Sequence, residues 1–294
     1  MGTLHVGDVS IDRIEEMYGA FFPVETLLPA FNRDAVENHG PGTFAPFVDQ
    51  DAQMAYVSMH SWLVRTPRST ILIDTCSGNH KERPNMPPFH HLDLPYLQRL
   101  ADAGVQPEDV DYVICTHLHL DHVGWNTTLV DGEWVPTFPN ATYLFNQTEF
   151  DFWNPDSNPD QAGLDYNAGV FDDSVRPVLD HGLAQLWDGD LDIDEVFHLA
   201  MATGHTAGHH VGWLESNGEW ALFSGDAMHS PMQVFEPTWN SGFCAKVDEA
   251  ITTRQKLLET CAEHDALLCP AHFAAPHAFR IVAKGNGMAA VGVH

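Results

Sequence analysis

Short apolar runs separated by polar turns dominate the chain, and most of these runs have the length of a β-strand. The clearest of them lie at residues 54–66, 70–74, 110–115, 141–145, 196–201, 210–214, 220–223 and 266–269. Asn217-Gly218 separates two of these runs, and Asp131-Gly132 gives a second strong hairpin-turn signal. The pattern therefore predicts a protein rich in β-structure.

Two stretches have the apolar spacing of an amphipathic helix. Residues 94–103 follow this spacing until Gly104 ends it, and residues 247–264 follow it over a longer span. Asp248 and Glu249 lie in the first turn of the longer helix, where the helix dipole favours acidic side chains. Residues 147–190 have a weaker pattern, which predicts one or two helices among loops.

The first 50 residues differ from the rest of the chain. We expect a first strand at residues 4–11, followed by an irregular, aromatic-rich arm that packs against the body of the protein. A second interpretation makes the arm a lid over a substrate pocket or part of a contact between two copies in a homodimer. We treat residues 1–294 as a single domain, because a chain of this length can bury a substantial core.

Acidic side chains greatly outnumber basic ones: there are 41 Asp and Glu against 13 Lys and Arg, a formal net charge of −28. Such a surface repels nucleic acids and anionic membranes, because both are bound through basic side chains. No apolar stretch approaches the ~20 residues of a membrane span, and the N-terminus lacks the pattern of a secretory signal. We therefore expect a cytoplasmic protein with neither a nucleic-acid partner nor a membrane partner.

The strongest chemical signal is a segment that reads Thr-His-Leu-His-Leu-Asp-His-Val-Gly-Trp. It places His117, His119, Asp121 and His122 directly after a predicted buried strand. Imidazole nitrogen and carboxylate oxygen bind divalent transition metals where no thiolate is offered. His117 and His119 are two residues apart and can converge on one metal, which leaves Asp121 and His122 for a second metal beside it.

The spacing His-x-His-x-Asp-His resembles the signature of the metallo-β-lactamase superfamily. The similarity continues along the chain, because later apolar runs are followed, in the order that the family requires, by His205, Asp226 and His272. The resemblance implies an α/β (α+β) fold, an αββα sandwich of two packed mixed β-sheets flanked by helices. Residues 1–125 and 140–280 are each β-rich and followed by helix, which suits this fold with a site along one edge.

The dinuclear members of the superfamily imply how the ligands are divided. The first metal takes His117, His119 and His205, the second takes Asp121, His122 and His272, and Asp226 bridges the two. The implied cofactors are two divalent metal ions, with zinc as the first expectation and manganese, cobalt or iron as alternatives. A bridging water would lose a proton near neutral pH, and the hydroxide would attack a lactone, ester or related centre. Asp121 or Asp226 would pass a proton to the leaving group.

Two further residues are expected to support the ligands without binding metal. Asp74 ends a buried strand, where a carboxylate needs a partner. In the superfamily an Asp at this point supports the metal-binding loop, and we carry that role over to Asp74. His209 lies four residues after His205 and is expected to have a supporting or structural role.

At several positions this chain lacks the residue that is typical of a particular branch of the superfamily, and these differences exclude some of the family's activities. Asp226 is not the cysteine of the common zinc β-lactamases, and His119 is not the glutamate of the di-iron oxygen-reducing branch. RNA-processing members need a basic surface, which this acidic chain lacks. The segments around Asp226 and His272 resemble the lactonase and organophosphate-hydrolase branch, which implies hydrolysis of a small lactone or ester, with a phosphotriester as the alternative.

His229 is expected to act in catalysis. Quorum-quenching acyl-homoserine lactonases usually carry tyrosine three residues after the bridging Asp, and this chain has His229 there. The difference favours relatives with broader ester, lactone or phosphotriester substrates. An imidazole at this point would hydrogen-bond the substrate carbonyl or the developing oxyanion, and the alternative is a rim histidine that faces water.

Aromatic and methionine side chains near the strand ends are candidates for a substrate pocket: Phe22, Phe89, Trp125, Met232 and Phe273. The substrate expected from these side chains and from the strongly negative chain is a small, apolar, uncharged molecule.

Other members of the superfamily provide rival functions. A mononuclear-iron persulfide dioxygenase would hold one iron, whereas the hydrolase would hold two zinc, cobalt or manganese ions. A glyoxalase-II-like thioesterase would need basic residues near the pocket for its anionic glutathione substrate, and the few candidates are Lys81, Arg83, Lys246 and Arg280. A metal-binding fold with a degenerate site is the remaining alternative.

Overall fold

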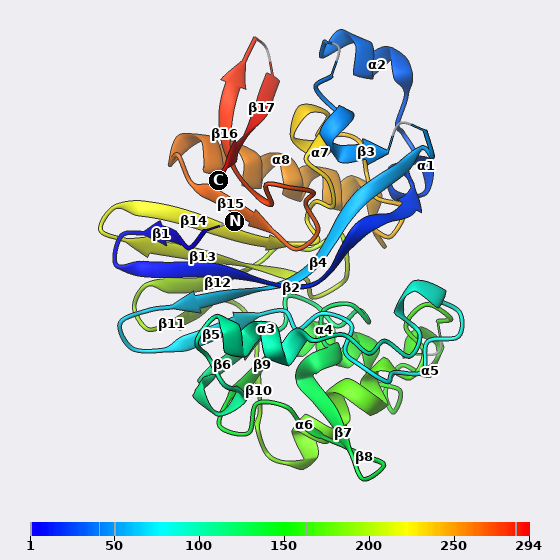
Figure 1. Ribbon diagram of the computed structural model, residues 1–294, viewed down its shortest axis with the longest axis vertical. Helices are drawn as coiled ribbons and strands as arrows, with labels where there is room; N and C mark the ends of the chain where they lie inside the picture. Colours follow the sequence, from blue (N-terminus) through cyan, green and yellow to red (C-terminus); the bar gives the residue numbers. More distant parts are fainter. Residues whose placement is uncertain (1, 41, 50, 163, 286) are drawn as a thin grey trace.

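The computed structural model describes residues 2–40, 42–49, 51–162, 164–285 and 287–294, and its strands form two large sheets (Figure 1). The first sheet contains β1 (Leu4–Val6), β2 (Val9–Pro23), β3 (Val48–Asp49), β4 (Met54–Arg65), β5 (Thr70–Ile73), β6 (Tyr112–Ile114), β9 (Thr142–Asn146) and β10 (Ala184–Trp187). Its strand order is β1-β2-β4-β5-β6-β9-β10, and β3 pairs with β4. The strands β5, β6, β9 and β10 are parallel, so their carboxyl ends meet at one edge.

The second sheet contains β11 (Leu191–Ile193), β12 (Phe197–Met201), β13 (His210–Ser216), β14 (Glu219–Gly225), β15 (Leu267–Pro270), β16 (Ala278–Lys284) and β17 (Gly287–Val293), in that order. The predicted Asn217-Gly218 hairpin joins β13 to β14. The predicted Asp131-Gly132 hairpin joins β7 (Thr127–Val130) to β8 (Glu133–Pro136), which form a separate two-stranded sheet. Both turn predictions are therefore confirmed.

The two large sheets bury a common apolar layer between them. Ile71 and Leu144 of the first sheet belong to the same buried cluster as Phe197 of the second. The ring centroids of Trp62 and Phe223, which come from different sheets, are 6.3 Å apart. Burial of apolar surface is the main favourable contribution to folding, and large aromatic side chains supply much of that surface.

Helices pack on the outside of this sandwich (Figure 1). They are α1 (Val24–Leu27), α2 (Arg33–Asn38), α3 (Tyr96–Asp102), α4 (Gln147–Trp153), α5 (Pro159–Ala162), α6 (Arg176–Asp180), α7 (Met232–Phe235) and α8 (Val247–Glu263). The helix α3 contacts β2, α4 contacts β9 and β10, and α8 contacts β16. The predicted αββα sandwich is confirmed, and among the described residues no helix is long and apolar enough to cross a membrane.

The prediction of an irregular arm over the first 50 residues was wrong. The strand β2 runs for 15 residues and pairs with β4 along its length, and only the segment after it consists of short elements. Two β-bulges, between Glu15 and Met17 and between Ala20 and Phe22, break the alternation of apolar and polar residues on which a strand prediction depends.

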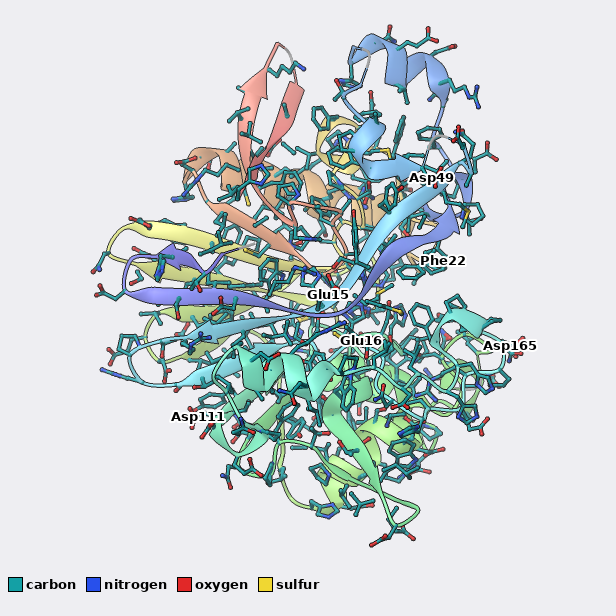
Figure 2. The ribbon with its side chains drawn as sticks, in the orientation of Figure 1. Glu15, Glu16, Phe22, Asp49, Asp111 and Asp165 are labelled. Atoms are coloured by element: carbon teal, nitrogen blue, oxygen red, sulfur yellow. The ribbon has the colours of Figure 1, made fainter. Side chains whose placement is uncertain are left out.

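The first bulge has a structural purpose, because it turns Glu16 into the protein (Figure 2). Glu16 is 1% exposed and accepts hydrogen bonds from the backbone nitrogens of Ser77 and Gly78 and from Trp125 Nε1. The N-terminal strand therefore fixes loops that belong to the interior of the domain.

The predicted apolar run at residues 266–269 forms most of β15 (Leu267–Pro270), but two further strands that the pattern did not indicate follow it. The antiparallel hairpin of β16 and β17 follows β15 and completes the second sheet. The sequence of β17, Gly-Met-Ala-Ala-Val-Gly-Val, has small residues and little polar alternation, so its pattern does not distinguish a strand from a loop.

Candidate metal centre

The predicted ligands come from loops that follow four strands and meet at one edge of the sandwich. His117, His119, Asp121 and His122 lie on the loop after β6, and His205 lies on the loop after β12. Asp226 directly follows β14, and His272 lies two residues after the end of β15, the parallel neighbour of β14. The structure brings all seven side chains together, although they are separated by up to 155 positions in the sequence, the difference between 117 and 272.

The first ligand group consists of His117, His119, His205 and Asp226. His117 Nε2 and His119 Nδ1 are 3.0 Å apart, and His205 Nε2 lies 3.2 Å and 3.0 Å from these two atoms. The carboxylate oxygen Oδ2 of Asp226 is 3.4 Å from His205 Nε2. Three nitrogens and one oxygen therefore face one small space.

The second ligand group consists of Asp121, His122 and His272. His122 Nε2 and His272 Nε2 are 3.1 Å apart, and Asp121 Oδ2 is 3.6 Å from His272 Nε2. Asp226 Oδ1 lies 3.3 Å from His122 Nε2 and 3.0 Å from His272 Nε2. One oxygen of Asp226 thus faces the first group and its other oxygen faces the second.

The chemistry of these donors fits bound cations. His122 donates its Nδ1 proton to Asp74, at 2.8 Å, and His272 donates its Nδ1 proton to the Ser58 carbonyl, at 3.1 Å. A neutral imidazole that uses one nitrogen as donor presents a lone pair on the other, so the facing nitrogens repel each other unless a cation or a proton lies between them. Asp226 Oδ1 is buried and makes no hydrogen bond within the described residues. Two divalent cations would satisfy these atoms.

Burial and charge act differently on the two groups. Burial lowers the pKa of His119 to about 3 and the pKa of His117 and His205 well below the usual value, which keeps these imidazoles neutral and ready to bind metal. Burial also lowers the pKa of His122, but Asp226 and the other nearby carboxylates outweigh it and raise the pKa well above the usual value. The negative charge that favours a proton in the second group would equally favour a cation.

The two supporting residues make the contacts that such a role requires. Asp74 accepts hydrogen bonds from Thr116 N at 2.7 Å and from His122 Nδ1, so it ties the end of β5 to the metal-binding loop. His209 belongs to neither ligand group. Its Nδ1 donates to the Ala202 carbonyl and its Nε2 accepts from the backbone nitrogen of Asp226, so it fixes the backbone of Asp226.

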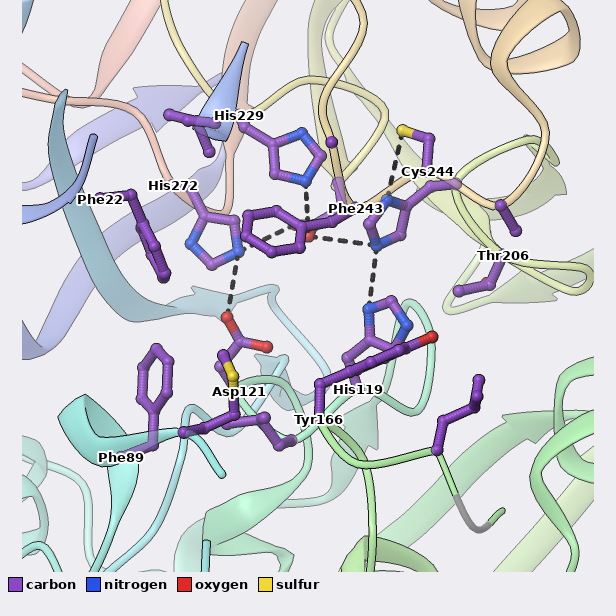
Figure 3. A pocket seen from close by; sticks show the side chains of 18 of the residues that line it. Phe22, Phe89, His119, Asp121, Tyr166, Thr206, His229, Phe243, Cys244 and His272 are labelled. Atoms are coloured by element: carbon purple, nitrogen blue, oxygen red, sulfur yellow. Dashed lines mark hydrogen bonds and ion pairs between the residues drawn. The ribbon is translucent and has the colours of Figure 1, made fainter. Parts of the chain in front are cut away.

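His229 lies beside Asp226 and lines the same cavity as His119 and His272 (Figure 3). Its Nε2 is 3.1 Å from Asp226 Oδ2, and its ring lies parallel to that of His272, with 5.9 Å between the centroids. Neither ring nitrogen makes a hydrogen bond of regular geometry within the described part of the chain. The imidazole therefore has capacity for a partner that enters the site.

A cavity of about 390 Å³ opens from the two ligand groups (Figure 3). Its floor contains His119, Asp121, His205, Asp226, His229 and His272. Most of its wall is apolar: Phe22, Leu27, Val57, Met59, Met86, Phe89, Leu120, Phe152, Trp153, Leu164, Tyr166 and Phe243. This composition suits an uncharged molecule with a sizeable apolar part.

Three of the five predicted pocket residues do not line this cavity. Trp125 is buried, stacks on Tyr96 and donates to Glu16. Met232 and Phe273 are fully buried, and the ring of Phe273 packs against Phe279. Of the five, Phe22 and Phe89 are on the cavity wall. The other three show that a position near a strand end does not determine whether a side chain points into the cavity or into the core.

The sequence reasoning missed several residues of the site. Phe243 and Cys244 line the cavity from the segment before α8, and Cys244 Sγ lies 3.5 Å from His205 Nδ1. Glu149 is buried against two ligand loops. The sequence did contain a signal for the start of the helix that carries Glu149, because Asn146 and Glu149 have the spacing of a capping box. The Asn146 side chain does cap α4.

Comparisons with known proteins agree with this geometry. The family model described as the metallo-beta-lactamase superfamily matches residues 57–272. The N-acyl homoserine lactonase AttM of Agrobacterium fabrum is 29% identical over 190 residues, which are 63% of this chain and 66% of the relative. An N-acyl homoserine lactonase of Bacillus thuringiensis is 23% identical over 167 residues, which are 53% of this chain and 57% of the relative. The chain thus spans less than two thirds of the length of these curated relatives.

Two solved structures resemble the whole domain. The hydrolase AbOPH of the beta lactamase superfamily has a TM-score of 0.80 at 26% identity, over 99% of this chain and 97% of the other. AidC, a dizinc quorum-quenching lactonase, has a TM-score of 0.75 at 22% identity, over 100% of this chain and 97% of the other. The family match covers well over half of the chain and includes all seven candidate ligands. The chain belongs to the metallo-β-lactamase superfamily.

Proposed function

We propose that this chain is a dinuclear metal-dependent hydrolase that opens a lactone or cleaves an ester of a small, largely apolar, uncharged substrate. The observation that carries the proposal is the pair of ligand groups that share Asp226 and open into an apolar cavity. The relatives named as lactonases support the same reaction class.

The metal ions would be held in the two groups described above. His117, His119 and His205 would bind the first, Asp121, His122 and His272 the second, and Asp226 both. Zinc is our first expectation because the donors are nitrogen and oxygen, and manganese, cobalt and iron are the alternatives. When bound, such cations supply Lewis acidity for a carbonyl oxygen and make water a nucleophile near neutral pH.

The side chains of the cavity floor would carry the remaining steps. Water oxygen bonds to the carbonyl carbon, the ester C–O bond breaks, and the departing oxygen takes up a proton. His229 Nε2 faces the cavity beside Asp226 and is placed to donate a hydrogen bond to the substrate carbonyl as negative charge develops on it. Asp121 also lines the cavity and is placed to accept the proton that the attacking water loses and to pass it to the departing oxygen.

The anionic thioesters of the glyoxalase-II-like alternative fit this cavity less well. Among the described residues, no Lys or Arg lines the wall. The four basic residues considered from the sequence make ion pairs with acidic residues elsewhere: Lys81 and Arg83 with Asp173, Lys246 with Glu249, and Arg280 with Asp265. A carboxylate on the substrate would have no basic partner in the cavity.

The direct test is hydrolysis by purified protein across a panel of γ- and δ-lactones, aryl esters, a phosphotriester and a glutathione thioester. We expect turnover of a lactone or ester that disappears on chelation and returns with zinc or manganese. Turnover of the phosphotriester or thioester alone, from protein that holds two metals, would overturn the substrate assignment. Turnover that survives complete removal of metal would overturn the mechanism.

A further inference from the structure

Glu149 is a buried carboxylate that the proposed reaction does not use. It lies in α4, is 1% exposed, and faces the loops that carry the first ligand group. Burial raises the pKa of its carboxyl group, and four hydrogen-bond donors oppose this effect. A carboxylate so deeply buried is retained only where those donors replace the water that it has lost.

The donors come from three segments of the chain. Oε1 accepts from Leu118 N at 3.1 Å and from Trp153 Nε1 at 2.7 Å. Oε2 accepts from Thr206 Oγ1 at 2.7 Å and from Gly208 N at 2.8 Å. Four donors on two oxygens match an ionised carboxylate, which accepts hydrogen bonds and donates none.

Two of these segments carry the three histidines of the first ligand group. Leu118 lies between His117 and His119, and Thr206 directly follows His205. The Trp153 indole, held by the same carboxylate, packs its ring against His119 with 5.3 Å between the centroids. A single side chain thus fixes the backbone on both sides of the first metal site.

The backbone at Gly208 is adapted to this contact. A Cβ at Gly208 would lie 2.3 Å from the backbone nitrogen of Glu149 and 2.6 Å from its Cβ, distances that no side chain tolerates. Glycine therefore allows the start of α4 to approach the His205 loop closely enough for both oxygens of Glu149 to be used.

The second ligand group is held by different residues. His122 Nδ1 donates to Asp74, and the backbone carbonyl of His122 accepts from Thr75 N. The ring of His272 donates to the Ser58 carbonyl. None of these contacts passes through Glu149, so the second group does not depend on it.

We infer that Glu149 is a positioning residue that holds the His117–His119 and His205 loops in register and sets the affinity of the first metal site without setting that of the second. The inference rests on the metal-binding part of the proposed function. Glu149→Gln keeps the size of the side chain but replaces one acceptor oxygen with an amide donor, which faces two of the four donors and cannot satisfy them.

The test is metal content of the full-length protein after zinc loading and gel filtration, together with zinc affinity by chelator competition. We expect two zinc ions in the wild type, and in E149Q a loss of about 10- to 100-fold in affinity at one site with the other unchanged. Asp151→Asn, an exposed carboxylate on the same helix, is the matched control and should keep both ions.

Double variants identify the weakened site. E149Q combined with His272→Ala should retain almost no zinc, whereas E149Q combined with His205→Ala should retain one ion. Hydrogen exchange of the metal-free protein gives a second readout, in which the amides of Leu118 and Gly208 should exchange faster in E149Q but not in D151N.

Two results would overturn the inference: E149Q that holds both ions with unchanged affinity, or E149Q that weakens both sites equally. If E149Q does not fold, Glu149→Asp decides in the same way, since it keeps the charge but shortens the reach. A wild type that binds no metal would overturn the proposed function together with this inference. A wild type with two ions and an unchanged E149Q would overturn this inference alone.

Discussion

The ligand cluster and the Glu149 contact are neighbouring buried polar regions that differ in how their hydrogen bonds are satisfied. Around Glu149, four donors converge on two acceptor oxygens, and the chain itself completes the set. Around Asp226, imidazole nitrogens and carboxylate oxygens converge on one another, with centres 3.0–3.4 Å apart. The first region is complete without a ligand, whereas the second has the donor set that cations would complete.

The difference fits the proposed roles, in which the ligand cluster performs the reaction and the Glu149 contact supports it. A satisfied buried network is rigid because each contact fixes the others. A converging set of lone pairs is costly to bury and persists only where the surrounding structure holds it in place. In this chain the rigid contacts at Glu149, Asp74 and Glu16 surround the unsatisfied ligands at the strand ends.

His229 extends the unsatisfied region into the cavity, and removing it should have the largest effect on turnover. Because His229 lines the cavity and neither of its ring nitrogens makes a regular hydrogen bond within the described residues, we assign them to the substrate. We expect His229→Ala to lower kcat by about 10²- to 10³-fold while both metals stay bound. Steady-state kinetics and metal content on the same preparation measure the two quantities.

His181 is exposed, and His181→Ala is the control, which should change neither kcat nor the metal content. Parallel loss of activity and of metal in His229→Ala would make His229 a structural residue and remove it from the proposed mechanism.

The apolar wall should affect substrate binding more than chemistry. Phe22 lies on the cavity wall and contacts the ring of Phe243, with 5.5 Å between the centroids. Phe22→Ala should raise KM for apolar substrates by about 10-fold, since lost pocket contacts cost about 1–3 kcal/mol. A substrate series with shortening acyl groups should show this penalty shrinking, and a constant penalty would mean that Phe22 acts on the fold.

Trp125 provides the opposite case and the smallest expected effect on catalysis. Its indole supports Glu16 and does not reach the cavity, so Trp125→Phe should leave KM and kcat close to those of the wild type. Loss of the hydrogen bond to a buried carboxylate should lower the free energy of unfolding by about 1–3 kcal/mol. Denaturant unfolding measures the loss of stability. A large change in KM would show that Trp125 contributes to the substrate pocket after all.

The sequence revealed the ligands because each follows an apolar strand and because His117 to His122 are close together in the chain. It also predicted both hairpins, since Asn217-Gly218 and Asp131-Gly132 act locally. These signals depend on neighbouring residues alone. The αββα architecture and the division of the ligands between two metals came from the resemblance to the superfamily.

Features that depend on distant contacts were not predictable in this way. Glu16 contacts residues 61 and 62 positions away. The bulge that turns it inward also interrupts the alternation of apolar and polar residues by which β2 could have been predicted. Met232 and Phe273 were predicted in the pocket because they lie near strand ends, but their side chains pack into the core. The pocket wall is assembled from five or more separate segments, and no local pattern reports such an assembly.

The central claim is that two metal ions lie on either side of Asp226. Anomalous diffraction from crystals of zinc-loaded protein, recorded on both sides of the zinc absorption edge, tests it most directly. The account predicts two peaks, one among His117, His119 and His205 and one among Asp121, His122 and His272, each in contact with one oxygen of Asp226. A single peak, or two peaks that do not share Asp226, would contradict it.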